Sequence, residues 1–128
     1  MSCTLKVLYI DDEPDIREVA VMALELDAGI EACSAASGPE AMAILTGEAF
    51  RPDVVLLDVM MPGQDGPAVL AELRARGFRM PVIFITARAQ SHELAHYLRI
   101  GGEGVITKPF DPMTLALELR AVMARAAR

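Results

Sequence analysis

Short apolar runs alternate along the chain with longer stretches in which apolar residues recur every three or four positions. The runs fall at residues 5–10, 30–35, 54–57, 82–85 and 105–107. Runs of this length, bounded by Gly, Pro or charged residues, are typical of strands, and residues 30–35 alternate in the manner of a sheet edge. The intervening stretches have the spacing of amphipathic helices. The pattern therefore predicts five strand–helix units.

Local signals mark the ends of the predicted helices. Helix starts are indicated by a proline or a capping side chain at Pro14, Ser37, Ser91 and Asp111. Helix ends are indicated by glycine at Gly29, Gly77 and Gly101. On the first helix, the residues expected to face the core are Ile16, Val19, Ala20, Ala23 and Leu24.

Short links between strand and helix restrict the topology. Parallel strands need a crossover, and the crossovers are right-handed in nearly all cases. The sequence thus predicts an α/β fold, a doubly wound five-stranded parallel sheet with helices on both faces. With strand order 2-1-3-4-5, the first and third strands would be adjacent where the strand order reverses.

Composition narrows the class of protein. The chain has 128 residues, 53% of them hydrophobic and 23% charged, which predicts one folded domain. The net charge of −6 argues against direct contact with nucleic acid. No apolar stretch approaches the roughly 20 residues of a membrane span. Cys3 and Cys33 fit neither a metal spacing nor a disulfide framework, which favours a cytoplasmic protein.

Polar residues follow four of the five strands. Asp11 and Asp12 follow the first, Asp58 ends the third, Thr86 ends the fourth and Lys108 follows the fifth. Because parallel strands share one carboxyl edge, we expect these side chains to converge there. Three ionised carboxylates in a small space need a cation, and oxygen ligands favour Mg²⁺. Asp58 could then attack phosphorus to form an acyl phosphate, while Lys108 and Thr86 contact phosphoryl oxygens.

These strand-end residues resemble the receiver domain of two-component response regulators, which is CheY-like. The matching segments are Asp11-Asp12-Glu13, Asp58, Met61-Pro62-Gly63, Gly66, Thr86-Ala87 and Lys108-Pro109-Phe110. They cover nearly the whole chain in the family's order and spacing. The resemblance implies a flavodoxin-like sheet of order 2-1-3-4-5 and a single receiver domain over residues 1–128, with no output domain present.

The resemblance also implies roles for individual residues. Asp58 would be the phosphoacceptor, loaded by a histidine kinase or a histidine phosphotransfer protein. The Mg²⁺ ligands would be Asp12, Asp58, the backbone carbonyl of Met60 and, at least partly through water, Asp11. Phosphoryl oxygens would contact Thr86, Lys108 and the backbone N–H of Ala87, next to a cis Lys108–Pro109 bond.

By the same resemblance, the protein is a phosphoacceptor that catalyses its own phosphoryl transfer and is no turnover enzyme. Phosphorylation would switch the binding of an unknown target on the face made by the fourth helix, fifth strand and fifth helix, or the phosphoryl group would be passed on. A homodimer is also open. The sequence names neither the kinase nor the target, and both a stand-alone protein and an excised domain fit it.

The chain departs from the family at Val105, where the family usually carries Tyr or Phe. A valine cannot report phosphorylation by the movement of a ring, so we expect another residue to take this part, and Tyr97 is the candidate. The departure also leaves open a degenerate receiver that binds a partner without being phosphorylated.

A second motif offers a different chemistry. His92-Glu93-Leu94-Ala95-His96 matches the H-E-x-x-H signature of zinc metallopeptidases, and Glu118 is a conceivable third ligand. The segment, however, is one helix of a complete strand–helix series, and a peptidase would leave the strand-end acids unexplained. We therefore expect His92 and His96 to be surface residues.

Overall fold

The computed structural model describes residues 4–87 and 90–126, which form five strands and five helices. The strands are β1 (Leu5–Ile10), β2 (Ile30–Ala35), β3 (Val54–Asp58), β4 (Val82–Thr86) and β5 (Gly104–Thr107). The helices are α1 (Pro14–Glu25), α2 (Gly38–Thr46), α3 (Gly66–Ala75), α4 (Ser91–Arg99) and α5 (Leu115–Ala126). Each strand is followed by one helix, as the sequence pattern predicts.

All strand pairs are parallel, and the sheet has the order β2-β1-β3-β4-β5, which confirms the predicted fold. The register brings the polar strand ends together. Ile10 of β1 is opposite Leu57 of β3, so the acids that follow these two residues begin at the same level. On the other side, Thr86 of β4 is opposite Thr107, the residue before Lys108.

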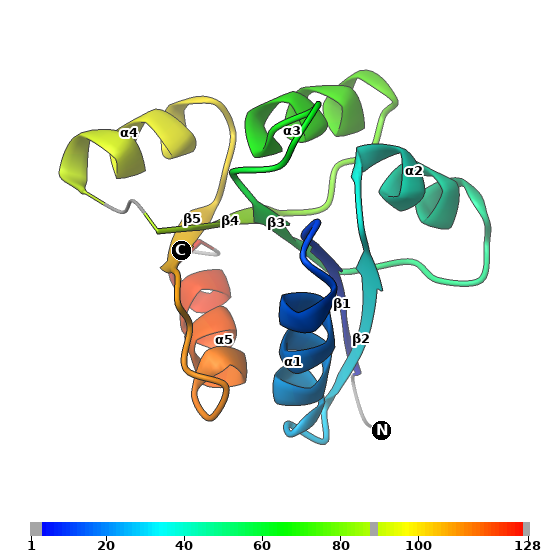
Figure 1. Cartoon of the computed structure of the whole chain (residues 1–128), viewed down its shortest axis with the longest axis vertical. Helices are drawn as coiled ribbons and strands as arrows, with labels where there is room; N and C mark the ends of the chain where they lie inside the picture. The colour runs from blue at the N-terminus through cyan, green and yellow to red at the C-terminus, as the bar shows by residue number, and fades with distance from the viewer. Residues whose placement is uncertain (1–3, 88–89, 127–128) are drawn as a thin grey trace.

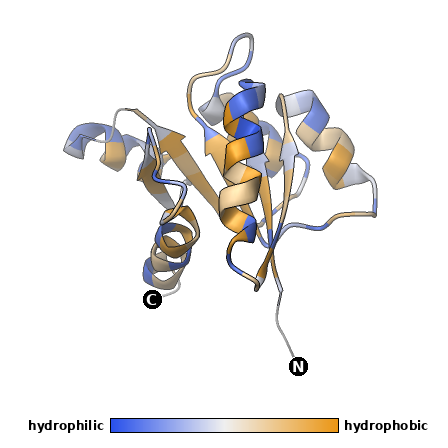
Figure 2. Cartoon of the chain, turned by 60° about the horizontal axis from the view of Figure 1, so that its bottom comes forward, coloured by the Kyte–Doolittle hydropathy of each residue, from blue (hydrophilic) through white to orange (hydrophobic). Residues whose placement is uncertain are grey.

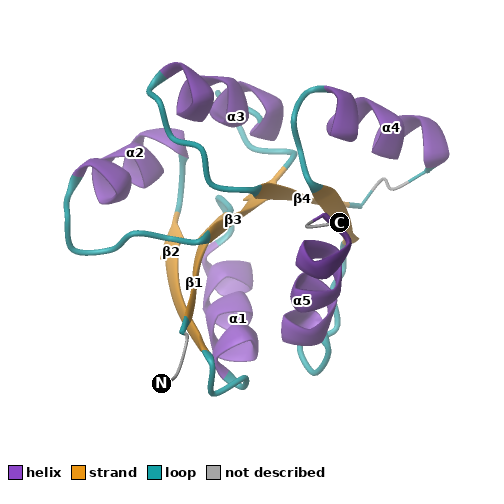
Figure 3. Cartoon of the chain, turned by 180° about the vertical axis from the view of Figure 1, so that it is seen from behind, coloured by secondary structure: helices purple, strands orange, loops and turns teal. Residues whose placement is uncertain are grey.

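Helices cover both faces of the sheet, with α1 and α5 side by side on one face and α2, α3 and α4 on the other (Figure 1; Figure 3 shows the same layers from behind). Alternate residues of β3 supply the two cores. Val54 and Leu56 pack with α1 and α5, whereas Val55 and Leu57 pack with the other layer. Figure 2 shows hydrophobic colour along the strands and mixed colour on the helices, as burial of one helix face requires.

Three of the predicted helix boundaries are wrong, and two of them are at α1 and α4. Helix α1 ends at Glu25, and Gly29 lies beyond it, donating its N–H to the Asp27 carboxylate at 2.8 Å in a separate turn. Helix α4 has Gln90 as its N-cap, so Ser91 is already helical and caps nothing. The backbone of Gln90 is extended, which moves the start one residue earlier than the serine suggests.

The boundary signals at Ser37, Gly77 and Gly101 have the expected roles. Ser37 caps α2 by accepting a hydrogen bond from the N–H of Glu40 at 3.2 Å. Gly77 and Gly101 end α3 and α4 with φ of 90° and 111°. Asp111, predicted to cap the fifth helix, instead caps a turn that precedes α5: its carboxylate accepts from the N–H of Met113 at 2.9 Å, and the helix begins only at Leu115.

Helix α1 carries an apolar stripe that the sheet does not cover. Val19, predicted to face the core, is 41% exposed, and Met22 and Leu26 are more exposed still. Cys33 is a half-buried free thiol, and Cys3 lies outside the described residues. Nowhere in the described ranges is a helix long and apolar enough to cross a membrane.

Candidate functional site

Three carboxylates meet at the carboxyl edge of β1 and β3. One oxygen each from Asp11, Asp12 and Asp58 lies within 4.8 Å of the other two. Asp11 and Asp58 are buried, while Asp12 is half-buried at the rim. The parallel pairing of β1 with β3 brings them together, as the sequence predicts.

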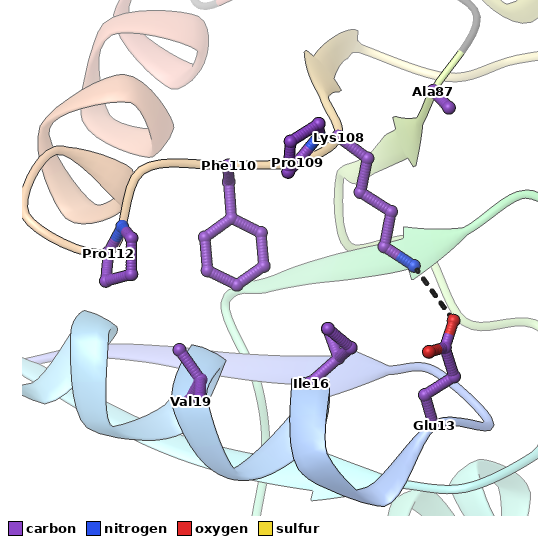
Figure 4. Close-up of a pocket in the computed structure, with 8 residues that line it drawn as sticks. All are labelled: Glu13, Ile16, Val19, Ala87, Lys108, Pro109, Phe110 and Pro112. Atoms are coloured by element: carbon purple, nitrogen blue, oxygen red, sulfur yellow. Dashed lines mark ion pairs between the residues drawn. The ribbon is translucent and has the colours of Figure 1, made fainter.

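Lys108 reaches this cluster from the end of β5. Its Nζ lies 3.0 Å from Oδ2 of Asp11, 3.4 Å from Oδ1 of Asp58 and 3.9 Å from Oε1 of Glu13. Figure 4 shows the long side chain directed at Glu13, which is mostly exposed. Lys108 therefore neutralises part of the charge of two buried acids.

The electrostatic state of Asp58 reflects its burial. Burial raises the pKa of Asp58 to about 6, with help from the charge of Asp11 and against the opposing effects of Lys108 and the backbone N–H of Met60. Burial would lower the pKa of Lys108, but its hydrogen bond and ion pair with Asp11, together with Asp58, leave that pKa above its ordinary value. The site is thus short of positive charge, which favours a bound cation.

Sequence reasoning missed Tyr9 as a member of the site. Its hydroxyl donates to Oδ2 of Asp11 at 3.0 Å, and burial, followed by the charge of Asp11, raises the pKa of Tyr9 so that it remains a neutral donor. Oδ1 of Asp11 accepts from the N–H of Glu13 at 3.1 Å. Both oxygens of Asp11 are therefore engaged. A tyrosine two residues before Asp11, on the same face of an aliphatic strand, was the available signal.

The strand ends β4 and β5 complete the edge. Thr86 is buried at the end of β4, Ala87 is exposed just beyond it, and the N–H of Lys108 donates to the carbonyl of Thr86 at 2.8 Å. The Lys108–Pro109 peptide bond is cis, as the family resemblance implied, and Pro109 is exposed.

The turn after Asp58 is held close to its strand. The N–H of Gly66 donates to the carbonyl of Val59 at 2.9 Å, and a Cβ at position 66 would lie 2.7 Å from the carbonyl oxygen of Asp58. Only glycine fits this approach. Asp65 caps α3 by accepting from the N–H of Ala68 at 3.0 Å, while the side chain of Met60 is 78% exposed.

A largely apolar groove of about 290 Å³ borders the acidic cluster on the side of α1. It is lined by Glu13, Ile16, Val19, Ala87, Lys108, Pro109, Phe110 and Pro112 (Figure 4). The ring of Phe110 points toward α1 and contacts the ring of Tyr9 edge-on, with centroids 6.4 Å apart. The groove thus joins the exposed stripe of α1 to the site.

The H-E-x-x-H motif lies elsewhere. His92 and His96 are exposed on α4, as expected, and Nε2 of His92 lies 3.6 Å from Oε1 of Glu93. No group of three or more metal-binding side chains in the described part of the chain includes either histidine.

Comparisons with known proteins give one consistent result. The family described as "Response regulator receiver domain" matches residues 7–120. The probable transcriptional regulatory protein TcrX of Mycobacterium tuberculosis is 39% identical over 93% of this chain and 50% of its own length. The transcriptional regulatory protein CseB of Streptomyces coelicolor is 38% identical over 93% of this chain and 49% of its own. The chain therefore spans about half the length of these curated relatives.

Solved structures agree. The Francisella response regulator 1452 receiver domain has a TM-score of 0.81 and 30% identity, covering 95% of this chain and 98% of that chain. The chemotaxis response regulator CheY4 of Vibrio cholerae has a TM-score of 0.80 and 32% identity, covering 93% of this chain and 98% of that chain.

Proposed function

The chain belongs to the response regulator receiver domain family, and on that premise we propose that it is a phosphorylation-dependent receiver whose phosphoacceptor is Asp58. The observation that carries the proposal is the position of Asp58, buried at the end of β3 among two other acids and 3.4 Å from Lys108. A buried carboxylate with a cationic partner and a cation-binding neighbourhood has the groups that phosphoryl transfer requires.

Receiver domains bind Mg²⁺ at an acidic pocket, and the donor set of this chain fits that ion. Asp12, Asp58 and the backbone carbonyl of Met60 would hold it directly. Asp11 would act through water, because both of its oxygens already accept hydrogen bonds. When bound, Mg²⁺ supplies positive charge that the acids and the phosphoryl oxygens share.

The transfer itself needs few groups. A carboxylate oxygen of Asp58 attacks the phosphorus of a phosphohistidine, a P–O bond forms, the P–N bond breaks, and the electron pair leaves with the imidazole. Lys108, Thr86 and the N–H of Ala87 would contact the transferred oxygens. The product is an acyl phosphate on the protein, so the chain is consumed as an acceptor and does not turn over.

The donor is a histidine kinase or a histidine phosphotransfer protein in the cytoplasm. The groove beside Lys108 offers apolar packing area next to Asp58, at Ile16, Val19 and Phe110. A donor helix seated there would bring its phosphohistidine to the acidic cluster. Phosphorylation then changes the binding of a target at α4, β5 and α5, or the group passes to another histidine.

Val105 keeps a second candidate in view, a degenerate receiver whose binding ignores phosphorylation. Intact-mass measurement after incubation with Mg²⁺ and phosphoramidate separates the two. We expect the wild type to gain one phosphoryl group and Asp58→Ala to gain none. Asp53→Ala, at an exposed position just before β3 and at the opposite end of the strand from Asp58, should behave as the wild type. An unmodified wild type would favour the degenerate receiver.

A further inference from the structure

Helix α4 is attached to the sheet through a pair of aromatic rings. Tyr97 is the buried residue of α4, all of which is described. Its ring lies against the ring of Phe84 in β4, with centroids 5.1 Å apart and planes inclined by 41°. Phe84 is fully buried. Because no other residue of α4 is buried, this ring contact anchors the helix to the sheet.

The chain that leaves α4 also wraps around Phe84. A Cβ at Gly102 would lie 2.8 Å from two ring carbons of Phe84 and 2.9 Å from the carbonyl oxygen of Tyr97. The N–H of Gly102 donates to that same carbonyl at 2.9 Å. Val105 then enters β5 opposite Phe84 in the parallel register. The ring of Phe84 thus contacts Tyr97 and lies against the turn at Gly102, and Val105 is its register neighbour on β5.

Phe84 is two residues before Thr86 on the same strand. Alternate residues of a strand point to the same face, so the side chains of Phe84 and Thr86 are neighbours on the face that α4 covers. Thr86 is 3% exposed and ends at the acidic edge. A change in the packing of Thr86 would therefore occur next to the ring of Phe84, which contacts α4 through Tyr97.

We propose that the Phe84–Tyr97 pair transmits the state of Asp58 to α4, in place of an aromatic ring at position 105. This relay rests on the function proposed above. When a phosphoryl group on Asp58 engages Thr86, the packing space beside Phe84 changes, and α4 repacks through Tyr97. The exposed apolar residues of α4, Leu94 and Leu98, move with the helix and alter the surface that a target meets.

The test is amide NMR of the full chain with Mg²⁺ alone and with Mg²⁺ and beryllofluoride, a stable mimic of an aspartyl phosphate. The relay variants are Tyr97→Leu and Phe84→Leu. Tyr97→Phe keeps the ring, and Val105→Ala shortens the third neighbour of Phe84 without removing a ring. The spectra before addition of beryllofluoride, with a thermal melt, report whether each variant is folded.

We expect every folded variant to bind beryllofluoride within about threefold of wild-type affinity. The reason is that the coupling free energy between Asp58 and α4 is only a small part of the free energy of binding. The beryllofluoride-induced shifts of the α4 amides should persist in Tyr97→Phe and Val105→Ala and shrink at least about twofold in Tyr97→Leu and Phe84→Leu. If Tyr97→Leu fails to fold, Phe84→Leu decides.

Wild-type α4 shifts in both leucine variants would overturn the relay, and so would an equal loss in Val105→Ala. A wild type that binds no beryllofluoride would overturn the proposed function, and the relay with it. The two failures are distinct, because the first occurs with an occupied site and the second without one.

Discussion

Nζ of Lys108 lies 3.4 Å from Oδ1 of Asp58, although β4 separates β3, which ends at Asp58, from β5, which ends one residue before Lys108. The lysine stem spans the end of β4 and places one positive charge between two buried acids. Lys108 is thus the counter-ion of the two buried acids, and by the proposed function it would also contact the oxygens of a phosphoryl group on Asp58.

These two roles of Lys108 predict opposite effects of its removal on the affinity for Mg²⁺ and for beryllofluoride. In Lys108→Ala the three acids lose a competing cation, so Mg²⁺ affinity should rise several-fold. Beryllofluoride affinity should fall by about tenfold or more, because a charge-assisted hydrogen bond is lost. Titrations of both ligands check this, with Arg51→Ala, at an exposed position, as a control of equal charge. A loss of affinity for both ligands would contradict the assignment.

Burial of Asp58 predicts that, when no metal is bound, the stability of the fold depends on pH. Its pKa of about 6 lies above the ordinary value of 3.8, so the folded state holds the proton more tightly than the unfolded state. The contribution of Asp58 to the free energy of unfolding falls as the pH rises from about 4 to about 6 and stays low above that. Asp58→Asn should therefore raise the melting temperature in chelator by a few degrees at about pH 7.5 and by less at about pH 4. Equal changes at both pH values would argue against a raised pKa.

The close approach at Gly66 predicts a loss of stability on substitution. A Cβ there meets the carbonyl oxygen of Asp58 at 2.7 Å and Cα of Val59 at 2.9 Å, both backbone atoms that cannot move aside. Gly66→Ala should lower the free energy of unfolding by about 1–3 kcal/mol. Denaturant unfolding measures this against Gly47→Ala, whose Cβ would meet its nearest atom at an ordinary 3.4 Å. Similar stability of the two variants would show that the turn yields.

The groove beside Lys108 predicts a defect specific to the protein donor. Val19→Asp places a charge on its apolar wall and should slow transfer from a phosphohistidine-bearing kinase by about tenfold, a typical effect of an interface substitution. Phosphorylation by phosphoramidate, which needs no protein surface, should not change. Leu98→Asp on α4 is the matched control, since Leu98 is 46% and Val19 41% exposed. Equal slowing by both variants would place the donor elsewhere.

The acidic site was predictable because its residues end a strand or directly follow one, and the carboxyl ends of parallel strands lie at one edge of the sheet. Asp11, Asp12, Asp58 and Lys108 needed only the strand pattern and the order. Tyr9 was not found, because its hydrogen bond to Asp11 depends on how a buried ring is oriented.

Other features depend on tertiary packing. The contact of Tyr97 with Phe84 is set by where α4 lies across the sheet, which no periodicity reports. Val19 has the spacing of a core residue, yet it is exposed, because the apolar face of α1 is wider than the part of it that packs on the sheet. The cap at Gln90 was missed because neighbouring Ser91 has the stronger capping propensity.

The central claim is that Asp58 is a competent phosphoacceptor, and a thermal melt tests it most directly. Wild type and Asp58→Ala are melted with Mg²⁺ alone, with beryllofluoride alone, with both together, and with Zn²⁺. A ligand that binds only the folded state raises the melting temperature. We predict a rise with beryllofluoride that needs both Mg²⁺ and Asp58. A wild type whose melting temperature does not respond to Mg²⁺ and beryllofluoride, or responds only to Zn²⁺, would contradict the account.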